Sequence, residues 1–426
     1  GRANKYAAEA FLARALMFDH NYAAANTALK DIIANGVTDL GAHFALNANF
    51  NNNFDAAMKN GPEAVFAVQM SVNDGSGGNN GNPGDILNFP AAGPTGCCGF
   101  YQPSFTMVNA FKVNAQGLPF INADGSLGAY DYNGGAIVAA INGASPGNTS
   151  TLKSDQGVDA TDATYLPDTT TPVDPRLDWT VGRRGIPFLD YGEMPGASWA
   201  RAQGDAGPYI NMKNVYRQSE AATESQSYQG WAPGQSSAMN FNMIRYSDIL
   251  LMAAECEVEV GTQAQAEIYV NQVRSRMSTN PANWVKGRLT GYTGGDATKP
   301  IIDNTQNAAN YVIGLYTGQI SGGTKEFARQ AVFYERRLEL SMEGQRFFDL
   351  QRWDGGSGSG APEPAGYMAT VLNAAIKTNT SYPPAYFGDA VMAGSTFTQG
   401  RNEIYPIPTN QISIEKGALK QNPNYP

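Results

Sequence analysis

The chain has 426 residues, of which 42% are hydrophobic and 16% are charged, a balance that indicates a globular protein with a thin charged shell. Its formal net charge of -9 argues against a nucleic-acid partner, because phosphate binding needs clustered lysine and arginine. No run of the sequence approaches the roughly 18 apolar residues of a membrane span. The histidines, His20 and His43, have no metal-ligating neighbour at suitable spacing, so we expect neither a zinc site nor a histidine-based triad.

The N-terminal segment, residues 2–36, has the periodicity of two helices joined by a short link. The first apolar stripe follows the i, i+4, i+7, i+11 spacing of one helix face and consists of Tyr6, Ala10, Ala13 and Met17. A second periodic run covers residues 22–33, and Gly36 is well placed to end it. We therefore expect a helical hairpin here.

Two long stretches, residues 71–104 and 143–240, interrupt the helical pattern. They are rich in glycine, proline and polar residues and have little periodicity. Because loops of this length inside a compact domain are usually functional, we expect them to form the ligand face. Minor strands are expected at residues 65–72 and 209–215, where β-branched and aromatic residues cluster.

The cysteines fall into an adjacent pair and an isolated residue. The Cα atoms of Cys97 and Cys98 are about 3.8 Å apart, below the usual disulfide range of about 4.4 to 6.8 Å. A bond between them would be strained and would stiffen a tight turn, so a vicinal disulfide and two free thiols both stay open. Cys256 lies on an apolar helical stretch, which predicts a small core residue.

The helical pattern returns in residues 243–280 and again in residues 325–353. The first block contains two periodic stripes on either side of Gly261, and the second block breaks near Gly344. Hairpins of this size, with small alanines at the crossing points, resemble tetratricopeptide-type (TPR-like) units. An ordinary helical bundle is the alternative, because two hairpins are too few to prove a repeat.

The densest block of charge lies between residues 335 and 353. Its members include Arg336, Arg337, Glu339, Glu343, Arg346, Asp349 and Arg352. Paired carboxylates suggest glycoside hydrolysis, but these carboxylates stand at i, i+3 from arginines. The expected pairs on the helix surface are Arg336 with Glu339, Glu343 with Arg346, and Asp349 with Arg352. Because a neighbouring arginine makes a carboxyl group a poor proton donor, we interpret the block as structural.

The aromatic residues of the long stretches suit a binding surface, since sugars present an apolar face and an edge of hydroxyls. We expect the pocket to be built by residues 79–104 and 183–234. The platforms would be Trp199 and Trp231, helped by Tyr101, Tyr191 and Tyr228, with Asn79, Arg183 and Asp190 as hydroxyl partners and the Cys97–Cys98 turn holding the first loop. For each aromatic taken singly, packing inside its own loop is the alternative.

Cofactor and metal motifs are not apparent. The glycine-rich run from Gly75 to Gly84 lacks the GK[ST] ending of a phosphate-binding loop. Asp155, Asp159 and Asp162 are acidic enough to suggest calcium, but the EF-hand spacing and its terminal glutamate are missing. We expect no cofactor and no metal.

Four ordered signatures resemble the SusD/RagB family. They are Arg245-Tyr246-Ser247-Asp248-Ile249-Leu250-Leu251 with Ala253-Ala254-Glu255, then Val270-Asn271-Gln272-Val273-Arg274-Ser275-Arg276, then the Glu335–Trp353 block, and finally Tyr405-Pro406-Ile407-Pro408 with Gln421-Asn422-Pro423-Asn424-Tyr425. Residues 2–36 and Asp174-Pro175-Arg176-Leu177 are also similar to family patterns. Several signatures in order are far more specific than one.

The resemblance implies an all-α fold in which TPR-like hairpins carry long loop insertions, with residues 1–426 forming one SusD-like domain. It also implies a non-catalytic protein that captures a glycan or oligosaccharide and delivers it to a SusC-like TonB-dependent transporter. Peptide capture by the same kind of complex is the alternative. The expected location is the extracellular face of the outer membrane, through an N-terminal signal and lipid-anchor cysteine that this sequence lacks.

Overall fold

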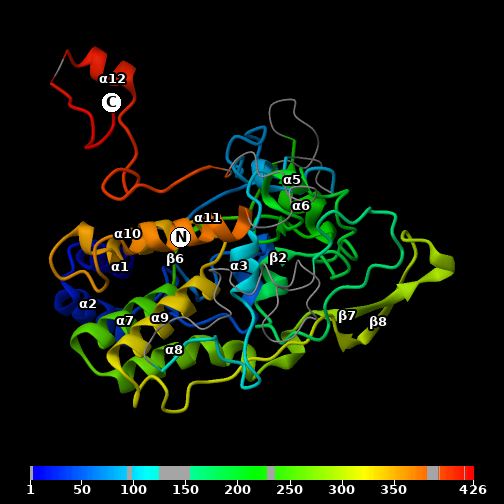
Figure 1. Ribbon diagram of the computed structural model, residues 1–426, viewed down its shortest axis with the longest axis horizontal. Coiled ribbons are helices and arrows are strands. Elements are labelled where there is room, and N and C mark those ends of the chain that lie inside the picture. Colours follow the sequence, from blue (N-terminus) through cyan, green and yellow to red (C-terminus); the bar gives the residue numbers. More distant parts are fainter. Residues whose placement is uncertain are drawn as a thin grey trace.

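The computed structural model describes residues 3–93, 98–123, 154–227, 236–380, 392, 394–416 and 418–426. Helices form one side of the molecule, and loops with short strands form the other (Figure 1). The hairpin of β7 (Lys286–Tyr292) and β8 (Pro300–Asn307) projects from the loop side, while the C-terminal segment with α12 (Thr409–Ile414) stands apart from the body (Figure 1). The predicted helical scaffold with loop insertions and minor strands is confirmed.

The expected N-terminal hairpin consists of α1 (Lys5–Phe18) and α2 (Tyr22–Asn35). Asn4 begins α1 as its cap, because its side-chain oxygen accepts a hydrogen bond from the Ala7 N–H at 2.9 Å. Gly36 ends α2 as predicted. The alanine-rich face of α1 is buried against α2, since small side chains let two helices approach closely.

The second hairpin consists of α7 (Tyr246–Val260) and α8 (Gln263–Ser278). Gly261 ends α7, and Thr262 caps α8 by accepting the Gln265 N–H at 3.2 Å. Helix α7 lies at the centre of the scaffold, where it packs against α2, α8 and α9 (Lys325–Glu339). Cys256 is fully buried in this core and is a free thiol, which confirms its prediction as a core residue.

A sharp turn separates α9 from α10 (Gln345–Trp353), at the predicted break. Met342 has a φ of 60° and Gly344 a φ of 76°, so the chain reverses through two left-handed residues. The rings of Phe333 and Trp353 stack with centroids 3.5 Å apart and hold α10 against α9. Helix α11 (Tyr367–Thr380), which the sequence analysis did not single out, covers α10.

The strands are short and form antiparallel pairs. β1 (Ala64–Val68) pairs with β6 (Phe241–Arg245), and β7 pairs with β8. The expected strand at residues 65–72 ends early, and the one at 209–215 shrinks to β3 (Ile210–Asn211), which pairs with β2 (Val181–Gly182). The pair β4 (Ser225–Gln226) and β5 (Ser236–Ser237) and the β7–β8 hairpin were not predicted.

Short helical turns connect these elements. The α-helical ones are α3 (Phe105–Asn109), α5 (Gln203–Ala206) and α6 (Ala221–Glu224), and the 3-10 ones are Phe50–Phe54, Ala56–Met58, Asp85–Asn88, Leu177–Trp179, Gln218–Glu220, Pro281–Asn283, Thr293–Gly295 and Gly355–Ser357. Within the described part of the loop side, buried aromatic and aliphatic residues such as Phe89, Phe188 and Met194 form a core of their own. The loop side is therefore packed on apolar residues as well as on polar contacts.

A network of buried ion pairs joins the two sides of the molecule. Glu339, the last residue of α9, is contacted by Arg176 Nη1 at 3.0 Å, Arg245 Nη1 at 3.0 Å and Arg276 Nη2 at 2.5 Å. Glu63, just before β1, accepts from Arg245 at 2.6 Å and Arg276 at 2.9 Å. Burial alone would raise the pKa of Glu339, but the guanidinium groups outweigh it and hold the pKa well below its ordinary value.

Further ion pairs connect to the same network. They are Arg176 with Asp174 and Glu335, Arg274 with Glu335, and Arg245 and Lys213 with Glu343. Acids and bases in this network are equal in number, so the buried charges compensate one another. Compensation of this kind makes the loss of any single member costly, because it leaves its partner buried and unpaired.

The structure corrects the expected pairing inside residues 335–353. Of the three expected i, i+3 pairs, Asp349 with Arg352 forms, at 2.8 Å. Arg336 instead contacts Asp248 at 2.8 Å and Asp349 at 3.0 Å, and Glu339 and Glu343 contact cations from distant segments. The groups are buried instead of lying on a helix surface, because neighbouring helices and the loop side cover α9.

Two further arginines of this block make different contacts. Arg337 Nη2 donates to the Thr106 carbonyl at 2.8 Å, and the guanidinium lies over the Tyr334 ring at 5.8 Å. The Arg346 guanidinium lies over the Trp353 ring at 5.5 Å. The expected Glu343–Arg346 pair is therefore replaced by a cation–π contact for Arg346.

None of the helices in the described ranges is both long enough and apolar enough to cross a membrane.

The network predicts an unequal response to two neutralising substitutions. Glu339→Gln leaves three arginines facing a neutral amide in the core, so we expect it to lower the free energy of unfolding by about 3–5 kcal/mol. Asp296→Asn removes one partner of the exposed Asp296–Lys299 pair and should leave stability nearly unchanged. Urea unfolding followed by circular dichroism measures both, and equal midpoints for the two variants would contradict the structural role of the network.

Candidate functional site

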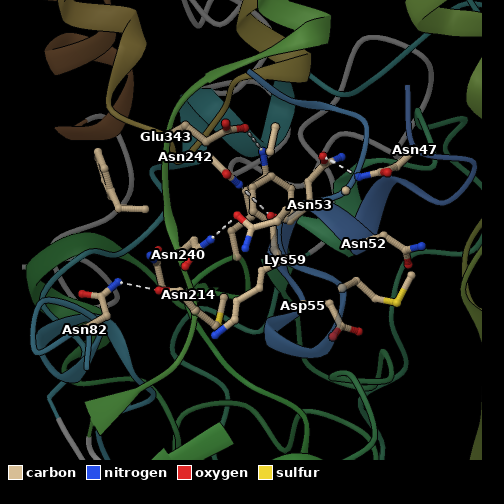
Figure 2. Close-up of a pocket in the computed structure, with 18 of the residues that line it drawn as sticks. Asn47, Asn52, Asn53, Asp55, Lys59, Asn82, Asn214, Asn240, Asn242 and Glu343 are labelled. Atoms are coloured by element: carbon tan, nitrogen blue, oxygen red, sulfur yellow. Dashed lines mark hydrogen bonds and ion pairs between the residues drawn. The ribbon is translucent and has the colours of Figure 1, made fainter. Parts of the chain in front are cut away.

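A polar pocket opens beside β1 and β6, where several loop segments meet. Its lining comes from residues 47–64, 82, 213–214, 239–242 and 342–343, and it encloses about 710 Å³, part of which is open to solvent. In the close-up, Asn53, Asn240 and Asn242 lie around the middle of the pocket, with Glu343 at one end and Asp55 at the other (Figure 2).

Asparagine is the commonest residue of the lining. The lining asparagines are Asn47, Asn52, Asn53, Asn60, Asn82, Asn214, Asn240 and Asn242. They come from segments far apart in the sequence, which β1–β6 pairing and the adjacent loops bring together. Each amide offers a donor and an acceptor side by side, an arrangement that suits vicinal hydroxyl groups.

Hydrogen bonds fix several of these amides in place. Asn53 Nδ2 donates to Glu63 Oε2 and to the Phe50 carbonyl, each at 3.0 Å, so the pocket wall is tied to the buried ion-pair network. Asn240 accepts the Met70 N–H at 3.0 Å and donates to Asn60 Oδ1 at 3.1 Å. The wall is therefore preorganised, which reduces the entropy lost when a ligand binds.

Other amide groups remain available to a ligand. Asn242 Nδ2 donates to the Asn53 carbonyl at 2.8 Å, but Asn242 Oδ1 accepts no hydrogen bond within the described parts of the chain. The Asn52 side chain, at the rim of the pocket in Figure 2, neither donates nor accepts a hydrogen bond within those parts of the chain. These groups can bond hydroxyls without breaking an internal bond.

Apolar side chains complete the lining. Phe241, at the start of β6, is 50% exposed, and Met58 is 48% exposed. Phe54, which also lines the pocket, is buried. An exposed ring and free amides in one lining have the composition of a carbohydrate site, because a ring can cover the apolar face of a sugar while amides bond its hydroxyl edge.

Most charged groups of the lining are paired with opposite charges. Asp55 accepts from Arg217 Nε at 3.0 Å, and Glu343 accepts from Lys213 at 2.7 Å and Arg245 at 2.8 Å. Lys59 donates to two backbone carbonyls, at 3.0 and 3.2 Å. Asp55, Glu343 and Lys213 are therefore paired with opposite charges, whereas the Lys59 ammonium group is held by neutral carbonyl groups.

Lys213 lies beneath the pocket floor and is buried. Burial lowers the pKa of its ammonium group to about 8, although the Glu343 carboxylate acts in the opposite direction. The ammonium also lies over the Phe54 ring, 4.5 Å from its centroid.

Among the described residues, no group of three or more histidine, cysteine, aspartate or glutamate side chains is arranged to hold a metal ion. Asp155, Asp159 and Asp162, considered above for calcium, therefore do not form such a group. Asp155 is buried and accepts a hydrogen bond from Gln203.

The described residues among those expected to contact a ligand do not line this pocket. Arg183 is buried and makes a two-point contact with Asp178, at 2.7 and 2.8 Å, so its guanidinium is held inside the protein. Asp190 accepts the backbone N–H groups of Gln218 and Ser219, and Asn79 donates to the Ser76 carbonyl at 2.7 Å. These contacts hold loops together.

The expected aromatic residues also pack within the loop side. Tyr191 donates to the Tyr216 carbonyl at 3.0 Å, and Trp199 makes an edge contact with Phe188, with centroids 5.7 Å apart. Tyr101 is 38% exposed and lines a neighbouring apolar groove. Their roles in ligand contact stay predictions.

Three of the expected residues, Tyr228, Trp231 and Cys97, lie outside the described residues. Cys98 is described and takes part in a disulfide bond. Its backbone carbonyl accepts from Arg201 at 3.0 Å, which ties this turn to the segment near Trp199.

The sequence reasoning missed most of the asparagines of the pocket. Asn82, Asn214 and Asn240 do lie in the two stretches expected to form the ligand face, but residues 47–61 were not considered. The signal was present in the composition, since residues 47–54 read NANFNNNF and residues 240–242 read NFN. Dense asparagine next to phenylalanine, outside a helix, marks polar turns that place amides and rings on one surface.

Comparison with known proteins decides the family. The sequence profile of the SusD family matches residues 62–425. The chain belongs to the SusD family. A SusD-like protein, P25, of Formosa agariphila is 28% identical over 111 residues, which is 26% of this chain and 15% of that protein.

Solved SusD-like structures share the fold. One from Bacteroides fragilis aligns with a TM-score of 0.52 and 17% identity, covering 100% of this chain and 66% of that one. A SusD homologue from Bacteroides thetaiotaomicron aligns with a TM-score of 0.51 and 18% identity, covering 100% of this chain and 64% of that one. This SusD-family chain thus spans less than two thirds of the length of the solved chains it matches.

Lys213 should make the stability of this SusD-family protein depend on pH. Its folded pKa of about 8 lies below the ordinary lysine value of 10.5, so between these values the unfolded chain binds more protons than the folded chain. The free energy of unfolding should therefore rise with pH in this window, and the gain disappears in Lys213→Met. Between about pH 7.5 and 9.5 we expect the wild type to gain roughly 1–2 kcal/mol over the variant. Chemical unfolding at several pH values measures it, and parallel pH profiles would contradict it.

Proposed function

We propose that this SusD-family protein captures a neutral oligosaccharide in the asparagine-lined pocket and passes it to a transporter. The observation that carries the proposal is the combination of free amide groups on Asn52 and Asn242 with the half-exposed ring of Phe241. Sugars need hydrogen-bonding pairs and an apolar platform together, and this lining supplies both.

The charges of the lining favour neutral sugars. Asp55 and Glu343 are each engaged by cations of the protein, and Lys59 and Lys213 are engaged by carbonyl and carboxylate oxygens. A uronic acid or a sulfated sugar would need a guanidinium or ammonium group directed into the pocket. Substrate selection would therefore rest on hydroxyl positions and ring stacking.

The same geometry favours capture over hydrolysis. Glycoside hydrolysis needs two carboxyl groups presented to either side of the scissile bond. The carboxylates at this pocket, Asp55 and Glu343, point their oxygens at Arg217, Lys213 and Arg245 instead. We therefore propose binding without turnover.

Family membership supports a further proposal, delivery to a partner. SusD-like proteins are associated with the cell surface, and we propose that this one works with a SusC-like TonB-dependent transporter at the outer membrane, held there by an N-terminal lipid. The helical scaffold would form the rigid body of the capture unit, because its hairpins are packed around α7.

Substitution of the platform should weaken sugar binding. Loss of the ring in Phe241→Ala should lower affinity about fivefold, which corresponds to roughly 1 kcal/mol, and Asn52→Ala should lower it by a similar factor. Phe348→Ala is the matched control, because Phe348 is 49% exposed on α10 but does not line the pocket. Isothermal titration with a panel of neutral oligosaccharides, followed by chromatography of the mixtures, measures both binding and turnover.

Each outcome of that screen is informative. Equal affinity of the Phe241→Ala variant and the control for the bound sugar would place the site elsewhere. Binding of peptides and of none of the sugars would replace the proposed ligand class, and the release of shorter sugars would replace capture with hydrolysis.

The transporter partnership has a separate test. Gentle detergent extraction of native membranes, followed by affinity isolation of this protein, should recover a large TonB-dependent transporter in comparable amount. Recovery of the protein alone, under conditions that preserve other SusC–SusD-type pairs, would contradict the partnership and leave the sugar-binding proposal untouched.

A further inference from the structure

A second concavity, which we call the β1-edge cleft, adjoins the asparagine pocket. It encloses about 370 Å³, including open space, and residues 64–67 of β1 form one of its walls. Thr38 and Asp39 lie on the wall opposite this strand in the lining, and Asn60 and Ala64 line both the cleft and the asparagine pocket. The two concavities therefore meet at Asn60 and Ala64, so a ligand that fills the pocket has a direct continuation into the cleft.

The cleft follows the edge of β1 that faces away from β6. Successive side chains of a strand point to opposite faces of its sheet, so a lining that contains the consecutive residues 64–67 indicates an edge. β6 pairs with the other edge and contributes none of the described lining residues. Within the described ranges, no strand pairs with the edge at the cleft. This edge therefore adds main-chain polar groups to the polar side chains of the lining.

A chain of side-chain amides joins the pocket to the cleft. Asn240, which lines the pocket, donates through Nδ2 to Asn60 Oδ1 at 3.1 Å and to Gln69 Oε1 at 3.2 Å. Gln69, which lines the cleft, donates through Nε2 to the Ala67 carbonyl at 3.2 Å. The boundary between the two concavities is thus polar and held in place by hydrogen bonds, as a ligand with many hydroxyl groups requires.

The turn that carries Thr38 and Asp39 is also fixed. The Thr38 N–H donates to the Ala42 carbonyl at 2.8 Å, and the Gly41 N–H donates to the Thr38 carbonyl at 3.0 Å. Gly41 has a φ of 82°, a left-handed conformation that glycine adopts without strain. Asn4 Nδ2 donates to the Val37 carbonyl at 2.7 Å and ties this turn to the start of α1. The wall is therefore preorganised.

Two side chains of this wall remain available to a ligand. The Asp39 carboxylate is exposed, and neither it nor Thr38 Oγ1 makes a hydrogen bond or ion pair within the described parts of the chain. A carboxylate accepts hydrogen bonds from two vicinal hydroxyl groups at once, and its charge repels an anionic sugar. The half-buried ring of Phe66 adds an apolar surface to the same lining. The cleft thus has the chemistry that suits a neutral sugar.

We propose that the captured ligand is an oligosaccharide chain that runs from the asparagine pocket past Asn60 into the β1-edge cleft, where its far units bond Asp39 and Thr38. This inference rests on the proposed function of the pocket and adds a second group of subsites to it. An extended peptide is a poorer fit, because β1 has five residues and its Ala67 carbonyl already accepts from Gln69, which leaves few main-chain groups for strand addition.

Chain length provides the first test. Isothermal titration compares the di-, tetra-, hexa- and octasaccharide of one neutral series that binds the pocket. Two added hydrogen bonds should raise the affinity about thirtyfold between the disaccharide and the hexasaccharide, which corresponds to about 2 kcal/mol. This gain exceeds the several-fold statistical advantage of a longer chain that offers more units to one pocket. An affinity that rises no further than this statistical advantage would overturn the proposal and leave capture in the pocket intact.

Substitution of Asp39 tests the position of the far units. Asp39→Ala should weaken hexasaccharide binding about tenfold and leave disaccharide binding unchanged, because the disaccharide fills the pocket alone. Asp39→Asn keeps an acceptor oxygen and should retain most of the hexasaccharide affinity. The matched control is Asp296→Ala, an exposed aspartate of the β7–β8 hairpin that lines neither concavity, and it should change neither affinity. Melting curves check that each variant is folded.

The outcomes separate this inference from the function on which it rests. Equal hexasaccharide affinity of the wild type and Asp39→Ala would overturn the continuation into the cleft, while Phe241→Ala would still weaken binding of both sugars if the pocket captures them. Failure of every neutral oligosaccharide to bind would refute the pocket and the cleft together. An extended peptide that binds the wild type and loses affinity in Asp39→Ala, when no sugar binds, would assign the cleft to strand addition and overturn the proposal.

Discussion

The compensation of buried charge at the end of α9 is the constraint on which the rest of the structure depends. Glu339 is buried among Arg176, Arg245 and Arg276, which come from the loop side, from the end of β6 and from α8. Each of these charges would be very costly to bury alone, so the segments that carry them must meet in one arrangement. The long insertions are thereby fixed to the helical scaffold by charge pairing as well as by apolar packing.

This constraint reaches the candidate site directly. Glu63 bonds the amide of Asn53, and Glu343 bonds Lys213 under the pocket floor, so members of the network hold the pocket wall in position. The turn that carries Glu343 also carries Met342, which separates the polar pocket from the apolar groove. A preorganised wall costs less entropy when a ligand binds, which suits a protein whose proposed task is capture.

The candidate site was only partly predictable. The sequence analysis expected the ligand face in the stretches 71–104 and 143–240, and these supply Asn82, Lys213 and Asn214. It selected large aromatic residues as platforms, but Trp199 packs on Phe188 inside the loop side. A large ring gains more from burial than from exposure, so abundance in a loop does not place it at a surface. Arg183 is buried for a different reason, because Asp178 meets its charge in the interior.

The sequence by itself determined the helical hairpins, their ends at Gly36 and Gly261, the break at Gly344 and the family, because periodicity, caps and ordered motifs are local properties of the chain. Only the tertiary structure decided which charges pair. Arg336 meets Asp248 and Asp349 instead of Glu339, because α7, α9 and α10 pack side by side. Likewise, Asn53 and Asn242 face one pocket only because β1 pairs with β6, a contact between segments that no local pattern relates.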